Sequence, residues 1–223
     1  MTTLAAVLFD LDGTLLDTLQ DLADAANQTL TKQGFPPHAP DAYRYFVGEG
    51  VRRLFWQALP AEARDERTVA CCAEQFREAY AACWHVHTRP YPGIPELLQA
   101  LTQRGVSRAV LSNKPDHFTQ LCVREKLGAF AFQAVWGQRE GRPLKPDPTS
   151  AREVAAQLGL APAQIVYLGD SGVDMQTAVA AGMYPVGALW GFRPREELTA
   201  GGARTVVQQP AELLPLLDRA IAD

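Results

Sequence analysis

Short apolar segments that alternate with helix-like segments constrain the fold of this chain most strongly. Runs of the length and composition of buried strands lie at 4–9, 106–112, 132–137, 164–170 and 184–191. Between them, segments that begin at proline or stop at glycine have the punctuation of helices, at 95–104, 148–158 and 172–181. Strands and helices in alternation predict an α/β fold around a mostly parallel sheet, with helices on both faces.

Residues 17–88 interrupt this alternation. Helical spacing of apolar residues marks the start of the segment, at Leu19, Leu22, Ala26 and Leu30. The stretches 43–59 and 62–84 also have the pattern of helices. We therefore predict an inserted α-helical subdomain at 17–88, within a core domain formed by 1–16 and 89–223. The two connections of this insert can act as hinges.

Composition excludes several partners. The net charge is −4, from 21 basic and 25 acidic residues, and both nucleic acid and anionic membranes favour a basic surface. The first residues, MTTLAAVLF, lack the basic start of a secretion signal, and no apolar run reaches the ~18 residues of a membrane span. The cysteines have no metal-binding spacing, which is typical of free thiols. We expect a cytoplasmic protein that binds neither nucleic acid nor membrane.

Acidic residues follow the first predicted strand directly. The apolar run 5–9 leads into Asp10 and Asp12, although carboxylates are rarely buried without a partner. Because ligands bind at the carboxyl ends of parallel strands, Asp10, Ser112 and Asp170 are expected at one edge of the sheet. Asp10 and Asp170 can converge on one cation, and hard oxygen ligands favour Mg²⁺. The competing interpretation is that these acids cap helices, as Asp170 could.

A lysine and a strand-terminal Ser-Asn pair suit a phosphate group. Lys145 lies between two prolines in REGRPLKPDP, just before a predicted helix, and the prolines restrict the backbone around it. The hydroxyl of Ser112 and the backbone N–H groups around Asn113 can bind phosphate oxygens. Taken singly, a loop lysine is usually solvated and Ser-Asn is usually turn chemistry. Their combination with the acids indicates a phosphate site.

Four motifs, taken in their order along the chain, resemble those of a known protein family. DLDGT (10–14), VLSNKP (110–115), LKPDP (144–148) and GDSGVDMQTAVAAG (169–182) resemble the haloacid-dehalogenase-like hydrolase superfamily. Its motifs are DxDGT, a strand-terminal Ser or Thr, a Lys and GDxxxD, and its helical cap is inserted where residues 17–88 lie. SNKP, KPDP and VGEGVRRLF (47–55) are most similar to the phosphoglycolate phosphatase group. The resemblance implies a Rossmann-like core with an inserted α-helical cap.

The resemblance also implies roles for individual residues. Asp10 would be the nucleophile that forms an aspartyl-phosphate. Asp12 would protonate the leaving oxygen and then deprotonate the attacking water. Ser112 and Lys145 would hold the transferring phosphoryl group, and Asp174 would orient Lys145 or a metal-bound water. The Mg²⁺ ligands would be Asp10, Asp170 and the backbone carbonyl of Asp12.

Substrate-binding residues are expected in both domains. In the core these are Thr14 and Asn113. In the insert they are Gly50, where the backbone can approach closely, and Arg52, which could clamp a carboxylate. The competing interpretation is that Arg52 belongs to a solvated helix face. A substrate that carries a carboxylate, such as 2-phosphoglycolate, would suit an arginine.

The predicted function is Mg²⁺-dependent hydrolysis of a phosphomonoester, with a small phosphorylated metabolite such as 2-phosphoglycolate as the substrate and a monomer or homodimer as the assembly. Asp12 favours an oxygen leaving group, because a departing halide needs no proton. Alternatives within the superfamily are a sugar-phosphate mutase similar to β-phosphoglucomutase, a pyrophosphatase and a nucleotidase. The alternative outside enzymes is a signalling module that accepts a phosphate on Asp10.

Overall fold

The computed structural model describes residues 2–218 and 220–221. The chain divides into two compact units, one formed by residues 1–16 and 90–223 and the other by residues 17–89. No helix among the described residues is both long enough and apolar enough to cross a membrane.

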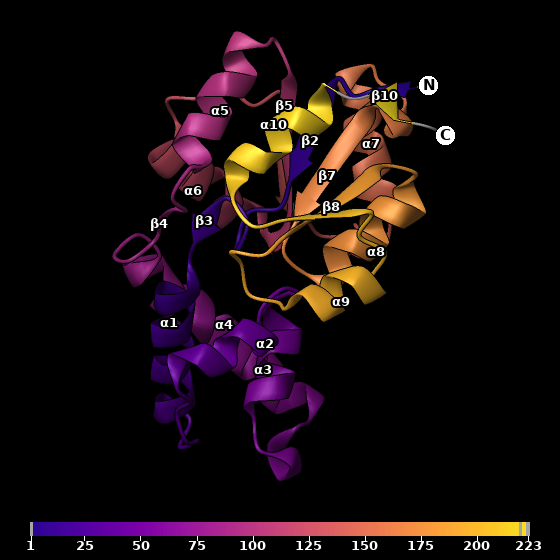
Figure 1. Cartoon of the computed structure of the whole chain (residues 1–223). Helices are drawn as coiled ribbons and strands as arrows, with labels where there is room; N and C mark the ends of the chain where they lie inside the picture. The colour runs from indigo at the N-terminus through magenta and orange to yellow at the C-terminus, as the bar shows by residue number, and fades with distance from the viewer. Residues whose placement is uncertain (1, 219, 222–223) are drawn as a thin grey trace. The chain divides into compact units, whose positions relative to one another are not determined.

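The first unit is built around a six-stranded parallel sheet (Figure 1). In spatial order its strands are β6 (Ala134–Gln138), β5 (Ser107–Pro115), β2 (Ala6–Phe9), β7 (Ile165–Gly169), β8 (Tyr184–Ala188) and β9 (Thr205–Val207). All residues of β2 are buried because the strand lies between two parallel neighbours, with Leu8 opposite Ala109 and Tyr167. The predicted strands are therefore confirmed, and β9 is added to them.

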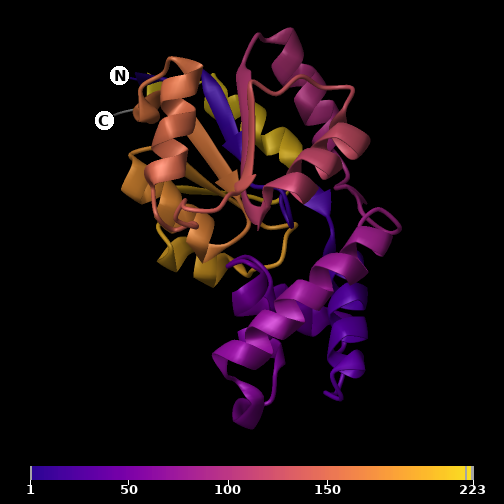
Figure 2. The same ribbon diagram turned by 180° about the vertical axis from the view of Figure 1, so that it is seen from behind.

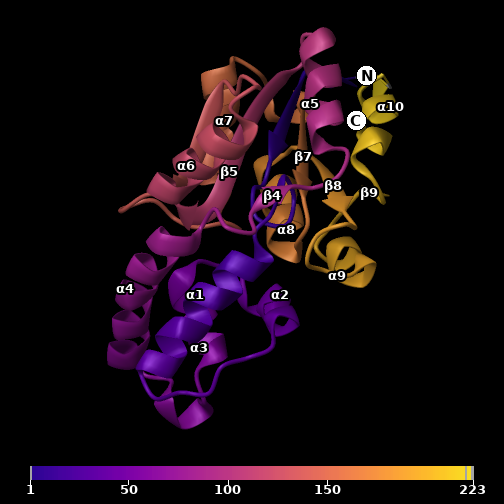
Figure 3. The same ribbon diagram turned by 90° about the vertical axis from the view of Figure 1, so that its left-hand side faces the viewer.

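Helices cover both faces of this sheet. They are α5 (Ile94–Gln103), α6 (Asp116–Leu127), α7 (Thr149–Leu158), α8 (Gly172–Ala181), α9 (Arg195–Ala200) and α10 (Leu214–Leu217). In Figure 3, α5 and α10 lie on one side of the strands and α7 on the other. Val154 of α7 and Ala178 of α8 join a buried cluster with Leu8 of the central strand. The predicted fold class, an α/β sheet with helices on both faces and a helical insert, is confirmed.

Two short strand pairs complete the topology. Near the ends of the chain, β1 (Thr2–Thr3) pairs antiparallel with β10 (Ala220–Ile221). At the junction of the two units, β3 (Leu16–Asp17) pairs with β4 (Arg89–Pro90). The helical insert therefore leaves and rejoins the chain at paired segments.

The second unit is helical. Its helices are α1 (Leu19–Lys32), α2 (Tyr43–Phe46), α3 (Val51–Ala58) and α4 (Glu66–Cys83), with 3₁₀ turns at Pro40–Ala42 and Ala61–Ala63. Helices α1 and α4 lie side by side (Figure 2). The aromatic ring of Phe76 in α4 stacks on Tyr80 and meets Phe55 of α3 edge-on, which closes a small core.

The prediction of continuous helices over 43–59 and 62–84 is wrong. The first is broken between α2 and α3, where Gly48 and Gly50 have φ values of 120° and 86°. These values lie outside the right-handed helical region and favour glycine. The second begins only at Glu66, because the side chain of Asp65 accepts hydrogen bonds from the backbone N–H groups of Arg67 and Thr68 and caps the helix there.

A buried carboxylate joins the two ends of the insert. Asp21 of α1 is 1% exposed. Its side chain accepts hydrogen bonds from the backbone N–H of His87 at 2.8 Å, and from the N–H and hydroxyl of Thr88 at 2.8 and 2.7 Å. The start of the insert is thereby fastened to the residues that precede β4.

Candidate active site

Three carboxylates meet at the carboxyl edge of the central strands. Asp10 directly follows β2, Asp170 follows β7, and Asp174 lies in the first turn of α8. One oxygen of each lies within 4.8 Å of the others, and all three residues are buried. The predicted convergence of Asp10 and Asp170 is therefore present in the structure, within the first unit.

Lys145 links two of these acids. Its Nζ donates to Asp10 Oδ1 at 2.8 Å and Asp174 Oδ1 at 2.7 Å, as well as to the carbonyl of Leu111 at 3.2 Å. Its side chain is only 4% exposed. Lys145 is therefore buried and paired. The competing interpretation of the sequence, a solvated loop lysine, does not hold.

Asn113 holds the main chain of this lysine. The carboxamide oxygen of Asn113 accepts from the N–H of Lys145 at 2.8 Å, and its Nδ2 donates to the Lys145 carbonyl at 3.1 Å. These two bonds join the end of β5 to the loop before α7. The structure thus gives Asn113 a positioning contact, in addition to the substrate contact expected from the sequence.

Two hydrogen bonds and two glycines position Asp170. Its Oδ1 accepts from the hydroxyl of Thr14 at 3.1 Å, and its Oδ2 accepts from the N–H of Phe192 at 2.7 Å. A Cβ on Gly13 would lie 2.3 Å from Asp170 Oδ2, and one on Gly191 would lie 2.3 Å from its Cβ. Both positions therefore need glycine for the carboxylate to fit.

Both oxygens of Asp174 are occupied by hydrogen-bond donors. Oδ1 accepts from Lys145, and Oδ2 accepts from the backbone N–H and hydroxyl of Ser171 at 3.1 and 2.6 Å. Ser171 in turn caps the N-terminus of α8. Of the two supporting roles predicted for Asp174, the contacts favour orientation of Lys145.

Sequence reasoning missed Lys114. Its Nζ lies 3.1 Å from both carboxylate oxygens of Asp12, and its side chain is 2% exposed. Ser112 lies two residues earlier in β5, and its hydroxyl accepts from the Lys114 N–H at 3.3 Å. The register of β5 shifts between Leu111 and Pro115, so regular strand alternation does not place Lys114. Its position directly after the Ser-Asn pair is the signal that could have drawn attention to it.

Burial and like charge govern the protonation of the acids. Burial, reinforced by Asp174 and opposed by Lys145, raises the pKa of Asp10 to about 7. Burial, with the nearby charges of Asp10 and Asp174, raises the pKa of Asp170 well above its ordinary value. Burial alone would lower the pKa of Lys145, but Asp10 and Asp174 outweigh it and raise that pKa, so the lysine remains charged.

The donor set fits a hard divalent cation. The oxygens of Asp10 and Asp170 converge, and both are carboxylate ligands of the type that such cations bind. A cation between them would offset the like-charge repulsion that raises their pKa values. The buried acidic group thus has the features of a divalent metal site.

The predicted residues of the insert have contacts inside the second unit. Gly50 precedes α3 with φ of 86°. The guanidinium of Arg52 pairs with Glu66, and the Arg52 side chain is 58% exposed. This exposed pair agrees with the solvated-face interpretation as well as with substrate contact.

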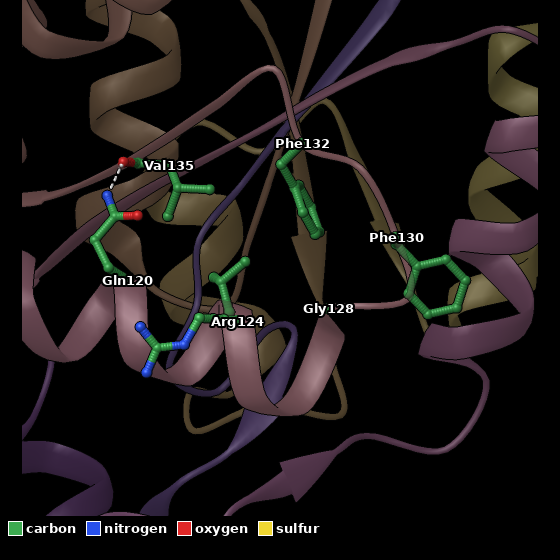
Figure 4. Close-up of a pocket in the computed structure, with 7 residues that line it drawn as sticks. Gln120, Arg124, Gly128, Phe130, Phe132 and Val135 are labelled. Atoms are coloured by element: carbon green, nitrogen blue, oxygen red, sulfur yellow. Dashed lines mark hydrogen bonds between the residues drawn. The ribbon is translucent and has the colours of Figure 1, made fainter.

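A separate pocket lies at the edge of the sheet formed by β6 (Figure 4). Its volume is about 340 Å³, and its lining comes from α6, the segment that follows it and β6: Gln120, Val123, Arg124, Gly128, Phe130, Phe132 and Val135. Gln120 donates to the carbonyl of Val135 there. None of the clustered acids or lysines lines this pocket, so it is not part of the candidate active site.

Comparisons with known proteins agree with this geometry. A model of the haloacid dehalogenase-like hydrolase family matches residues 7–188. A phosphoglycolate phosphatase of Pseudomonas putida is 36% identical over 214 residues, covering 94% of this chain and 78% of that protein. An N-acetylmuramic acid 6-phosphate phosphatase of Pseudomonas aeruginosa is 32% identical over 222 residues, covering 99% and 97%. A crystal structure from Lactobacillus delbrueckii subsp. bulgaricus has a TM-score of 0.90 at 32% identity, covering 97% and 99%.

Proposed function

This chain belongs to the haloacid dehalogenase-like hydrolase family and is a phosphatase, and we propose that it is a Mg²⁺-dependent phosphomonoesterase that acts through an aspartyl-phosphate on Asp10. Its substrate in this proposal is 2-phosphoglycolate or a similar small ester. The observation that carries the proposal is the buried Asp10 carboxylate, which contacts Lys145 and lies beside Asp170. The helical insert between β3 and β4 is consistent with the cap of the family.

The proposed reaction has two displacements at phosphorus. An oxygen of Asp10 attacks the phosphorus, and the bond between phosphorus and the alcohol oxygen breaks. Asp12 gives a proton to that departing oxygen. A water molecule then attacks the phosphorus, Asp12 takes the proton of the water, and the bond to Asp10 breaks. Free phosphate and the original carboxylate result.

Positioning groups supply most of the catalysis in such a transfer. Lys145 and Ser112 would hold the phosphoryl oxygens, while Asn113 and Asp174 fix Lys145 from its main chain and its ammonium group. The residues that would hold Mg²⁺ are Asp10, Asp170 and the carbonyl of Asp12. When bound, the cation neutralises charge on the carboxylates and on the phosphoryl group.

The choice of substrate rests on the relatives. Several curated relatives are phosphoglycolate phosphatases, which supports the carboxylated ester predicted from the sequence. The similarity to an N-acetylmuramic acid 6-phosphate phosphatase over nearly the whole chain supports a sugar phosphate as the second candidate. The phosphatase relatives argue against a signalling module that only accepts phosphate.

Steady-state turnover tests the proposal. We expect hydrolysis of p-nitrophenyl phosphate with Mg²⁺, loss of turnover in EDTA, and no turnover by Asp10→Asn. Asp41→Asn, an exposed acid of the insert paired with Arg44, is the matched control and should keep full activity. Retained activity in Asp10→Asn would refute the nucleophile. A panel of esters that includes 2-phosphoglycolate and N-acetylmuramic acid 6-phosphate then ranks the two substrate candidates.

A further inference from the structure

We propose that Lys114 binds a carboxylate on the leaving group of the substrate and so selects carboxylated phosphate esters. This inference rests on the proposed function, whose mechanism needs Asp12 beside the departing oxygen. Lys114 lies on that side of the site, with its Nζ 3.1 Å from both oxygens of Asp12. Lys145, on the side of Asp10, is the lysine assigned to the phosphoryl group.

The position of the ammonium group suits a short substrate. In 2-phosphoglycolate the carboxylate carbon is only two bonds from the oxygen that leaves. A substrate whose leaving oxygen lies beside Asp12 therefore also has its carboxylate close to Asp12. Lys114, whose Nζ contacts Asp12, supplies a cation there.

The structure fixes the backbone of Lys114 firmly. Its carbonyl accepts from the hydroxyl of Thr119 at 3.1 Å, and its N–H donates to Ser112 at 3.3 Å. A Cβ on Gly137 of β6 would lie 2.7 Å from the Lys114 carbonyl oxygen, so only glycine permits this close packing. A cation on such a backbone needs little reorganisation to bind an anion, which favours affinity.

The ion pair of Lys114 gives a second reason. Lys145 pairs with Asp10 and Asp174, and Lys114 forms a further buried pair with Asp12. Burying a further ion pair is a poor source of stability, because desolvation offsets the attraction. Stability alone therefore does not account for Lys114, whereas a contact with an anionic leaving group does.

The test compares two esters that differ in the carboxylate alone. These are 2-phosphoglycolate and 2-hydroxyethyl phosphate, measured with Mg²⁺. We expect the wild-type protein to have a higher kcat/KM for 2-phosphoglycolate, and Lys114→Met to reduce this preference at least tenfold, mainly through KM. Any effect of the substitution on Asp12 is common to both esters and cancels in the ratio. Lys32→Met, at the exposed end of α1, is the matched control and should keep the preference.

Several outcomes would overturn the inference. Equal kcat/KM values of the wild-type protein for the two esters would do so without any variant. An equal loss on both esters in Lys114→Met would make Lys114 a counter-ion of Asp12 only. If circular dichroism shows that Lys114→Met is unfolded, Lys114→Gln gives the same ratio test. Failure of the proposed function is distinguishable, because the wild-type protein would then hydrolyse neither ester nor p-nitrophenyl phosphate.

Discussion

Replacing Asp21 by alanine should destabilise the helical insert strongly. The substitution removes the acceptor of the His87 N–H, the Thr88 N–H and the Thr88 hydroxyl, at a residue that is 1% exposed. Each buried donor left without a partner costs about 1–3 kcal/mol. Because Thr88 supplies two buried donors and the His87 N–H is only partly buried, we expect a loss of about 3–5 kcal/mol in the free energy of unfolding.

Urea unfolding followed by circular dichroism measures this loss. Asp24→Ala, three residues further along α1 on its exposed face, is the control and should change the free energy of unfolding by less than about 0.5 kcal/mol. Amide hydrogen exchange gives a local readout, since the N–H groups of His87 and Thr88 should exchange faster in Asp21→Ala. A loss below about 1 kcal/mol with unchanged exchange at these amides would refute the reasoning.

Two further predictions concern the acids of the core. Gly13→Ala would place a Cβ 2.3 Å from Asp170 Oδ2 and should lower Mg²⁺-dependent turnover at least tenfold. Gly34→Ala is the control for backbone strain. The φ of Gly34 is 79°, against 86° for Gly13, but a Cβ on Gly34 would have no atom within 4 Å. Full activity in Gly13→Ala would contradict the close packing. In EDTA, the melting temperature should fall as pH rises from about 4 to about 7, because the folded-state pKa of Asp10 is raised from 3.8 to about 7 and the unfolded chain releases that proton first. The corresponding loss in the free energy of unfolding is on the order of a few kcal/mol, at about 1.4 kcal/mol per pKa unit. Mg²⁺ should reduce this loss. A melting temperature that rises with pH over this range would contradict the raised pKa of Asp10.

The core could be predicted from the sequence because its signals are local and agree with one another. Apolar runs bounded by proline and glycine marked the strands, and β2 is buried throughout as its composition indicated. The strand β9 could not be recognised because three residues, beginning with Thr205, are too short for a pattern. In the insert, helical periodicity continues across Gly48 and Gly50, so the break depends on backbone angles that periodicity does not contain.

In the site, too, the residues with local sequence signals could be predicted and those that depend on distant contacts could not. Asp10 and Asp170 were expected together because parallel strands end at a common edge. The apolar pattern of strand β5 ends at Ser112 and so does not indicate Lys114, whereas the strand continues to Pro115 with an irregular register. The role of Gly13 is also invisible in the sequence, since it depends on an Asp170 oxygen far away in the chain.

The pairing of β3 with β4 has an evolutionary consequence. Every residue of the acidic cluster, together with Lys114 and Lys145, belongs to the unit of residues 1–16 and 90–223. Since the insert departs and returns at neighbouring points, a replacement of different length or sequence adds little loop-closure entropy to the remainder. Descendants of such a gene can therefore acquire a different insert by recombination at two sites, while the clustered acids and lysines of the core are inherited intact.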